Sequence, residues 1–65
     1  MADFGGFTIR DGNYEKVGNL FFDRPKKTYA VMTYTKGNHL CEEWKEAFNL
    51  VKSLGYTISD YKEYE

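Results

Sequence analysis

Residues 39–54 carry apolar side chains at the spacing of an amphipathic helix. At about 100° per residue, one stripe of apolar side chains forms, with Phe48 on its flank. The stripe consists of Leu40, Trp44, Ala47, Val51 and Leu54. Asn38 is placed to cap the helix start, and Gly55 can take the left-handed conformation that ends a helix. The pattern predicts a helix of about four turns.

The chain before this helix has the composition of β-strands. Residues 7–10, 17–22 and 27–35 are rich in β-branched and aromatic residues, which favours three strands. Turn signals separate them: Asp-Gly-Asn at 11–13 and Asp-Arg-Pro at 23–25. Two short connections of this kind predict a three-stranded antiparallel meander.

Residues 56–61 alternate again after the helix and predict a further strand. The element order is then βββαβ. It predicts one small α+β domain over residues 1–65, an antiparallel three- to four-stranded sheet with one helix packed on one face. A single helix covers only one face of such a sheet, so the other face is open unless a partner fills it.

Alternation also predicts which side chains lie on each face. Alternation places four apolar residues of the first two strands on the face that the helix covers, and it places Phe21 on the opposite face. These four are Phe7, Ile9, Leu20 and Phe22. In the third strand both alternating sets are partly apolar, and one contains Tyr29 while the other contains Tyr34. Either assignment puts one of these two Tyr residues on the open face.

Composition adds an aromatic excess to this picture. Five Phe, six Tyr and one Trp make up 18% of the 65 residues. Because one aromatic side chain buries about 150–250 Å², we expect Trp44 and Phe48 in a core made of few large residues. The Tyr surplus is typical of a surface that binds. Gly5 and Gly6 are interpreted as a flexible lead-in.

Size and cysteine content exclude several classes. The chain is too short for two domains, and no apolar run reaches the ~20 residues of a membrane span. Its start lacks the basic-then-apolar pattern of a secretory signal. The single Cys41 excludes an internal disulfide and favours a cytoplasmic setting.

The net charge of −1 names no partner, but the charges are unevenly placed. Residues 1–37 hold six basic and four acidic side chains, whereas residues 38–65 hold three basic and six acidic ones. The division predicts a mildly basic sheet and an acidic helix and tail.

His39, Cys41 and Glu43 are the candidates for metal or nucleophile chemistry. His39 and Glu43 would share one face of a helix, but Cys41 would be turned away by about 200°. Two ligands do not make a site, and the chain has one His. We expect no metal and no cofactor, with Cys41 as a small apolar residue at the edge of the stripe.

These exclusions favour a non-enzymatic binder, because so small a fold offers neither a deep cleft nor a nucleophile–base pair. We expect a protein-binding module that occludes a larger protein or complex through its open sheet face. The expected contact residues combine Tyr anchors with a basic rim. They are Phe21, Arg24, Lys26, Lys27, Tyr29 and Tyr34. In its small size, its Tyr content and its lack of a catalytic set, the chain is similar to small phage or mobile-element inhibitors of host proteins. It shares no motif with them.

Three alternatives stay open at this point. Single-stranded nucleic acid could stack on sheet aromatics flanked by Arg and Lys, although an excess of two positive charges is small for that task. The open face could instead bind a second copy of the chain. The acidic residues could also mimic nucleic acid and block a basic groove. They are Glu42, Glu43, Glu46, Asp60 and Glu63.

Overall fold

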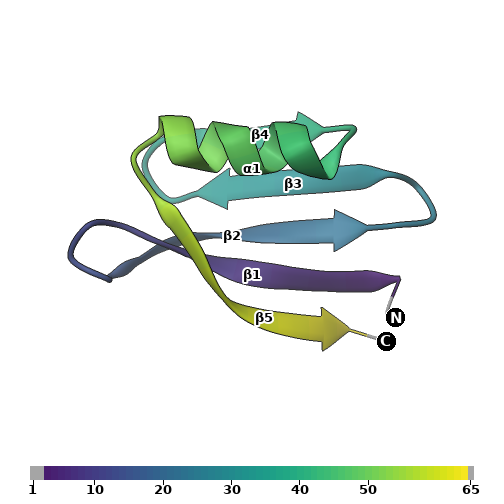
Figure 1. The fold of residues 1–65 in the computed structure, drawn as a ribbon, viewed down its shortest axis with the longest axis horizontal. Helices are drawn as coiled ribbons and strands as arrows, with labels where there is room; N and C mark the ends of the chain where they lie inside the picture. Colours follow the sequence, from purple (N-terminus) through teal and green to yellow (C-terminus); the bar gives the residue numbers. More distant parts are fainter. Residues whose placement is uncertain (1–2, 65) are drawn as a thin grey trace.

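The computed structural model describes residues 3–64. It forms an antiparallel five-stranded sheet with one helix packed on one face, so the small α+β fold is confirmed (Figure 1). The strands lie in the order β4-β3-β2-β1-β5 across the sheet. In chain order the elements are β1 Phe4–Arg10, β2 Lys16–Asp23, β3 Thr28–Thr33, β4 Gly37–Cys41, α1 Trp44–Ser53 and β5 Thr57–Tyr64.

Strand β4 corrects the predicted start of the helix and brings the strand count to five. Residues 37–41 pair with β3, with Leu40 opposite Ala30, so Asn38 is a strand residue and not an N-cap. The hydroxyl of Thr33 donates to the Gly37 carbonyl and accepts from the Lys36 N–H, both at 2.9 Å. Gly37 takes φ +83°, which favours glycine. This turn folds the chain back before the helix can begin.

Helix α1 begins after Glu43, which is extended and makes no side-chain cap hydrogen bond. Ala47 and Val51 are buried against the sheet. Lys52 lies in the last turn, and Gly55 follows with φ +81°, so the predicted helix end is confirmed.

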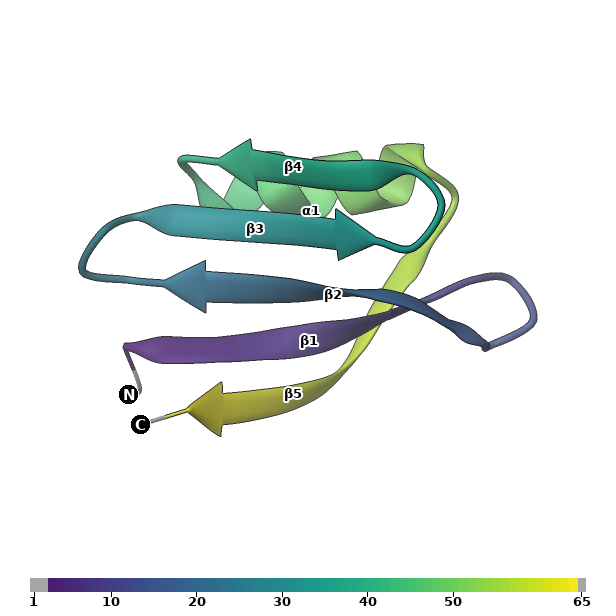
Figure 2. The same cartoon turned by 180° about the vertical axis from the view of Figure 1, so that it is seen from behind.

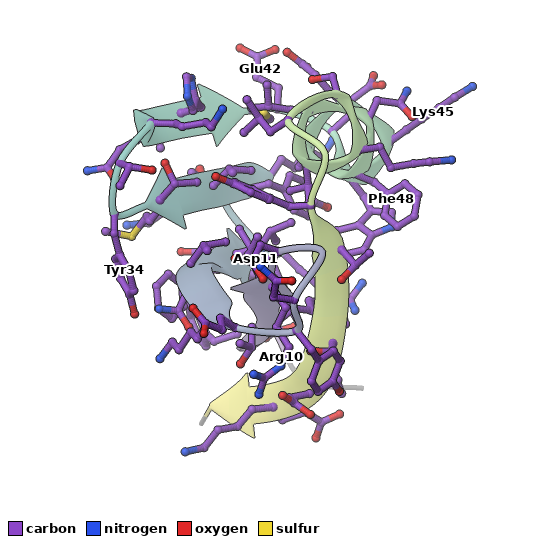
Figure 3. The ribbon with its side chains drawn as sticks, turned by 90° about the vertical axis from the view of Figure 1, so that its left-hand side faces the viewer. Arg10, Asp11, Tyr34, Glu42, Lys45 and Phe48 are labelled. Carbon is purple, nitrogen blue, oxygen red and sulfur yellow. The ribbon has the colours of Figure 1, made fainter. Side chains whose placement is uncertain are left out.

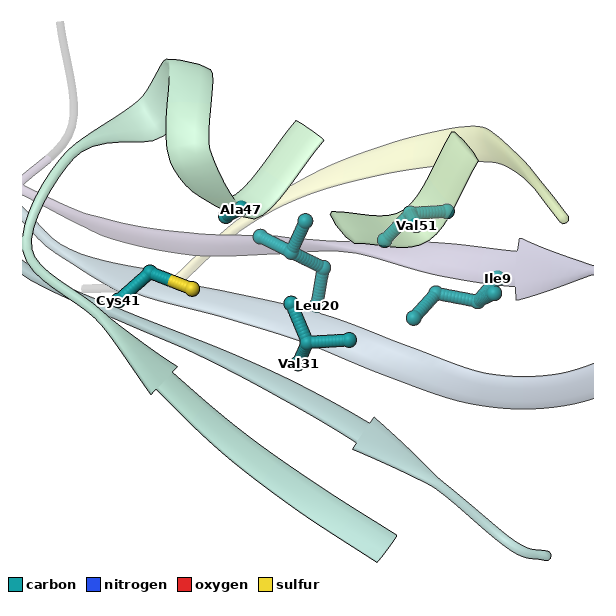
Figure 4. Packing of buried hydrophobic residues seen from close by; sticks show 6 residues of the cluster. All are labelled: Ile9, Leu20, Val31, Cys41, Ala47 and Val51. Atoms are coloured by element: carbon teal, nitrogen blue, oxygen red, sulfur yellow. The ribbon is translucent and has the colours of Figure 1, made fainter. Parts of the chain in front are cut away.

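The buried core between helix and sheet is small and mainly aliphatic. Figure 4 shows its six residues: Ile9, Leu20, Val31, Cys41, Ala47 and Val51. The predicted parity of Phe7, Ile9, Leu20 and Phe22 on the helix side is confirmed by the strand register.

The expectation that Trp44 and Phe48 fill this core is wrong, because 38% of Trp44 and 40% of Phe48 is exposed. The helix packs against β3, β4 and β5 with Ala47 and Val51 inward. The larger side chains of Trp44 and Phe48 therefore lie along the side of the helix and not beneath it.

Gly5 and Gly6 are not a flexible lead-in but paired residues of β1, opposite Phe22 and Phe21. A Cβ on Gly5 would lie 2.6 Å from Cζ of Phe22, and one on Gly6 would lie 3.1 Å from Cδ1 of Phe21. The two glycines therefore make room for one aromatic ring on each side of the sheet.

Candidate functional site

The sheet face away from the helix is uncovered, as Figure 2 shows from behind. Phe21 of β2 pairs with Ala30 of β3, which pairs with Leu40 of β4, so three apolar side chains form one row across the sheet. Met32 lies beside this row, on the same face. Leu40 is 78% exposed and Met32 is 39% exposed. We call these four residues the apolar patch.

Neutral polar residues border the apolar patch around Met32, and Lys62 of β5 continues its row beyond Gly6. Met32 has Asn19 on one neighbouring strand and Asn38 on the other, and Asn19 in turn faces Thr8. The centre of this face therefore combines apolar and amide side chains. Such a surface is typical of the central part of a protein interface, where charges are depleted.

A second surface, on the helix side, is a hollow of about 290 Å³ beside the start of α1. Five aromatic rings and one guanidinium line it, and they come from β1, β2, the loop after β2, β3, α1 and β5. The lining residues are Phe7, Phe22, Arg24, Tyr29, Trp44 and Tyr61. We call this site the aromatic hollow.

The rings of the aromatic hollow hold one another in place. The ring of Phe7 lies 5.2 Å from that of Trp44 and 5.0 Å from that of Tyr61, centroid to centroid. Phe22 and Tyr61 are parallel within 3° at 6.1 Å, and Tyr29 meets Trp44 edge-on at 6.0 Å. These spacings lie in the favourable range for aromatic pairs, so the hollow is preformed.

Arg24 supplies the charge in the aromatic hollow. Its guanidinium carbon lies 4.7 Å from the centre of the Phe22 ring, a cation–π contact. Its backbone N–H donates to the Asp3 carbonyl at 2.8 Å, and its carbonyl accepts from the Lys27 N–H at 3.1 Å. The loop after β2 is thereby fixed at the edge of the hollow.

Tyr61 reaches the hollow because of a β-bulge in β5. The β1–β5 register shifts between Gly6 and Thr8, and Asp60, at this point of β5, has φ +54°. Ile58 packs against the core, so strict alternation would turn Tyr61 to the open face. One extra residue reverses the alternation and places Tyr61 on the helix side.

An ion pair holds this bulge. The Arg10 guanidinium lies 2.7 Å from the Asp60 carboxylate, and the Arg10 side chain also donates to the Ser59 hydroxyl and the Tyr14 carbonyl, both at 3.1 Å. The hydrogen bond from Arg10 lowers the pKa of Asp60, and the same bond raises the pKa of Arg10.

The structure divides the predicted contact residues between the two surfaces. Arg24 and Tyr29 line the aromatic hollow, with Lys26 and Lys27 in the adjoining loop. Phe21 belongs to the apolar patch. Tyr34 is 66% exposed in the turn after β3, and Figure 3 shows it on the side of the sheet away from the helix. Of the two Tyr candidates for the open face, the structure therefore places Tyr34 there.

The acidic residues lie in two separate places. Glu42 and Glu43 precede the helix and Glu46 is in its first turn. On β5, Asp60 is bound by Arg10, and Glu63 accepts a hydrogen bond from the Tyr61 hydroxyl at 3.2 Å. The predicted division of charge between a basic sheet and an acidic helix and tail is wrong, because Asp60 and Glu63 lie on β5, which belongs to the sheet.

His39, Cys41 and Glu43 do not share a helix face, since none of them lies in the helix. Burial, with a smaller effect of Glu46, raises the pKa of the Cys41 thiol. Within residues 3–64 no group of three His, Cys, Asp or Glu residues is placed to hold a metal ion. Cys41 is a core residue, buried between β4 and the helix.

The aromatic hollow contains residues that the sequence did not identify as a site. Phe7 and Phe22 were not identified, although they share the helix side of the sheet with the predicted contact residue Tyr29, and this shared parity was the available signal. Tyr61 carried none, because the bulge reverses its direction. Trp44 was assigned to the core.

The chain matches no protein-family model, and neither the curated proteins nor the solved structures yield a match to it. None of the helices in the described part of the chain has the length and apolar character to cross a membrane.

Proposed function

We propose that this protein is a non-enzymatic protein-binding module whose open sheet face covers a surface of a larger protein. The observation that carries the proposal is the apolar patch, which ends in a Leu40 side chain that is 78% exposed. Contiguous apolar surface of this kind on a small domain is typical of an interaction site.

The character of the open face supports a protein partner. Its centre consists of Phe21, Ala30, Met32 and neighbouring Asn side chains, whereas nucleic-acid affinity depends on Lys and Arg contacts to phosphates. Strand β4 is also an edge of the sheet. Its outer backbone groups can pair with a strand of the partner.

Occlusion is the mode of action that the size of the protein supports. Its whole accessible surface is 4500 Å², and a standard interface takes about 800 Å² from each partner. One such interface would use nearly a fifth of the surface. We propose an inhibitor of the phage or mobile-element type, acting on a host protein in the cytoplasm, where the single buried Cys41 stays reduced.

The test is affinity capture with a matched pair of variants. The double variant Met32→Thr, Leu40→Lys changes only exposed side chains of the apolar patch, and Phe48→Lys makes a similar change on the helix side. We expect wild type and Phe48→Lys to retain the same partner, and the double variant to lose it. Thermal unfolding should show all three folded, because surface changes usually alter stability by less than about 0.5 kcal/mol.

Two results would contradict the proposal. The double variant could retain the same partner as strongly as wild type. Sedimentation could also show that the open face of wild type is filled by a second copy of the chain and that the double variant is a monomer.

A further inference from the structure

We propose that the aromatic hollow is a second binding site, which takes a nucleotide of single-stranded nucleic acid. The base stacks on the exposed rings, and the flanking phosphates contact the basic loop after β2. The site lies on the opposite side of the sheet from the apolar patch, so it does not depend on the protein partner proposed above.

The size of the hollow fits one ring system. Its volume of about 290 Å³ lies just below the range of about 300–1,000 Å³ found for drug-sized ligands. Trp44 is 38% exposed and Tyr61 is 46% exposed, so both offer ring surface to a ligand. Bases of any sequence can stack on such rings, because every base has a π-face.

The charge of the hollow selects an anionic ligand. Arg24 is the charged residue among those that line it, and its guanidinium already occupies the face of Phe22. The positive charge of Arg24 repels a ligand cation and attracts a phosphate. The hollow therefore favours a ring that carries an anion.

The basic loop favours a ligand with repeated anions. Arg24, Lys26 and Lys27 place three cations within four residues of the loop after β2. Arg24 lines the hollow, whereas Lys26 and Lys27 line a neighbouring groove together with Glu42 and Glu43. A nucleic-acid strand carries one phosphate per nucleotide, whereas an acidic aromatic side chain brings one carboxylate. Glu63, bonded to Tyr61, and Glu43, next to Trp44, oppose the phosphates. We therefore expect weak binding, with a Kd on the order of 10⁻⁴ M at physiological salt.

Trp44 allows a direct measurement, because it is the single Trp of the chain and lines the hollow. Titration with an oligothymidylate of about eight nucleotides at about 50 mM salt should quench its fluorescence to saturation. If two or three phosphates are contacted, log K should fall against log salt with a slope of roughly −1.4 to −2.1.

Variants separate stacking from charge. Tyr61→Ala should weaken binding about 5- to 150-fold, the range for removing one stacking ring. Lys26→Ala should make the salt slope shallower by about 0.7. Lys45→Ala, a charge-matched change on the helix, and Tyr34→Ala, a ring-matched change, should leave binding unchanged. Arg24→Gln is a second variant that should lose affinity even if Tyr61→Ala proves unstable.

Four results would overturn the inference. Oligothymidylate could fail to quench Trp44, or quench Tyr61→Ala and Arg24→Gln as strongly as wild type. A duplex could compete as well as a single strand, which would indicate charge attraction alone. An acidic aromatic peptide could bind while the oligonucleotide does not. The Met32→Thr, Leu40→Lys variant should retain quenching, so a failure of the protein-binding proposal is distinguishable from a failure of this one.

Discussion

Asp60 shows how one residue shapes a surface. Its positive φ forms the bulge in β5, and its carboxylate is held by Arg10 at 2.7 Å. The bulge turns the side chain of the next residue, Tyr61, to the helix side of the sheet, where it lines the aromatic hollow. Asp takes the left-handed conformation more readily than most residues, but alternation along residues 56–61 gives no sign that Asp60 does so.

The Arg10–Asp60 ion pair predicts a pH dependence of stability. Arg10 lowers the pKa of Asp60 in the folded state. The contribution of the ion pair to folding stability is therefore complete above the pKa of Asp60 in the unfolded chain, about 3.9. It is lost as the pH falls through the lower pKa of the folded state. We expect the Tm difference between wild type and Asp60→Asn to be largest near neutral pH and to shrink below about pH 4. Thermal unfolding between pH 2 and pH 7 measures it, and a pH-independent difference would contradict the role of the ion pair.

A substitution at Gly5 should change both the stability of the protein and the shape of the aromatic hollow. A methyl group there would lie 2.6 Å from the Phe22 ring and 2.7 Å from the Lys62 carbonyl oxygen. Gly5→Ala should therefore cost about 1–3 kcal/mol in the free energy of unfolding and change the Trp44 emission.

The matched control for this change is Gly12→Ala, whose added Cβ meets nothing within 4 Å. Denaturant titration of both variants compares them. Equal stabilities for Gly5→Ala and Gly12→Ala would show that the Phe22 ring does not need the space that Gly5 provides.

At the scale of elements, the meander and the end of the helix were predictable, because local chemistry determines them. The Asp11 carboxylate accepts the N–H groups of Asn13 and Glu15, as its turn sequence suggested. Gly55 ends the helix for a similar reason. Such signals act within a few residues and can be recognised without knowing the rest of the fold.

The start of the helix was not predictable in this way. Leu40 lies four residues before Trp44, a spacing that suits a helix stripe, yet it also alternates with His39 and Cys41 as a strand residue does. A segment this short fits both periods. Pairing with β3 decides between them, and that contact is not visible in the local pattern. The apolar patch was likewise only partly predictable, since Leu40 was assigned to the apolar stripe of the helix.

The turn before β4 depends on the hydroxyl group of Thr33, and a substitution there tests how strongly. This buried residue bonds both Lys36 and Gly37. Thr33→Val keeps the shape and removes both bonds, which should lower the free energy of unfolding by about 1–3 kcal/mol. Amide hydrogen exchange should quicken most in β4. Uniform quickening throughout the sheet would show that Thr33 does not act on this hairpin.

The whole molecule presents two different faces on one thin sheet. The helix covers the β3–β4 side of one face of the sheet and leaves the other face uncovered (Figures 1 and 2). The aromatic hollow lies beside the helix, and the uncovered face carries the apolar patch. The six-residue buried cluster is built of aliphatic side chains and Cys41. Phe22 is buried beside it, Phe7, Tyr29 and Tyr56 pack against it, and Phe4, Tyr14, Tyr34, Trp44, Phe48 and Tyr61 are exposed.

Photo-cross-linking from one position tests the central claim, that the open face contacts another protein. A benzophenone side chain is placed at position 40, on the open face, and in a control at position 45, which Figure 3 shows projecting from the helix. In lysate of the source cells, we predict that position 40 joins the protein to one larger partner and that position 45 does not. A failure to cross-link from position 40, or equal yields of the same adduct from both positions, would contradict the account.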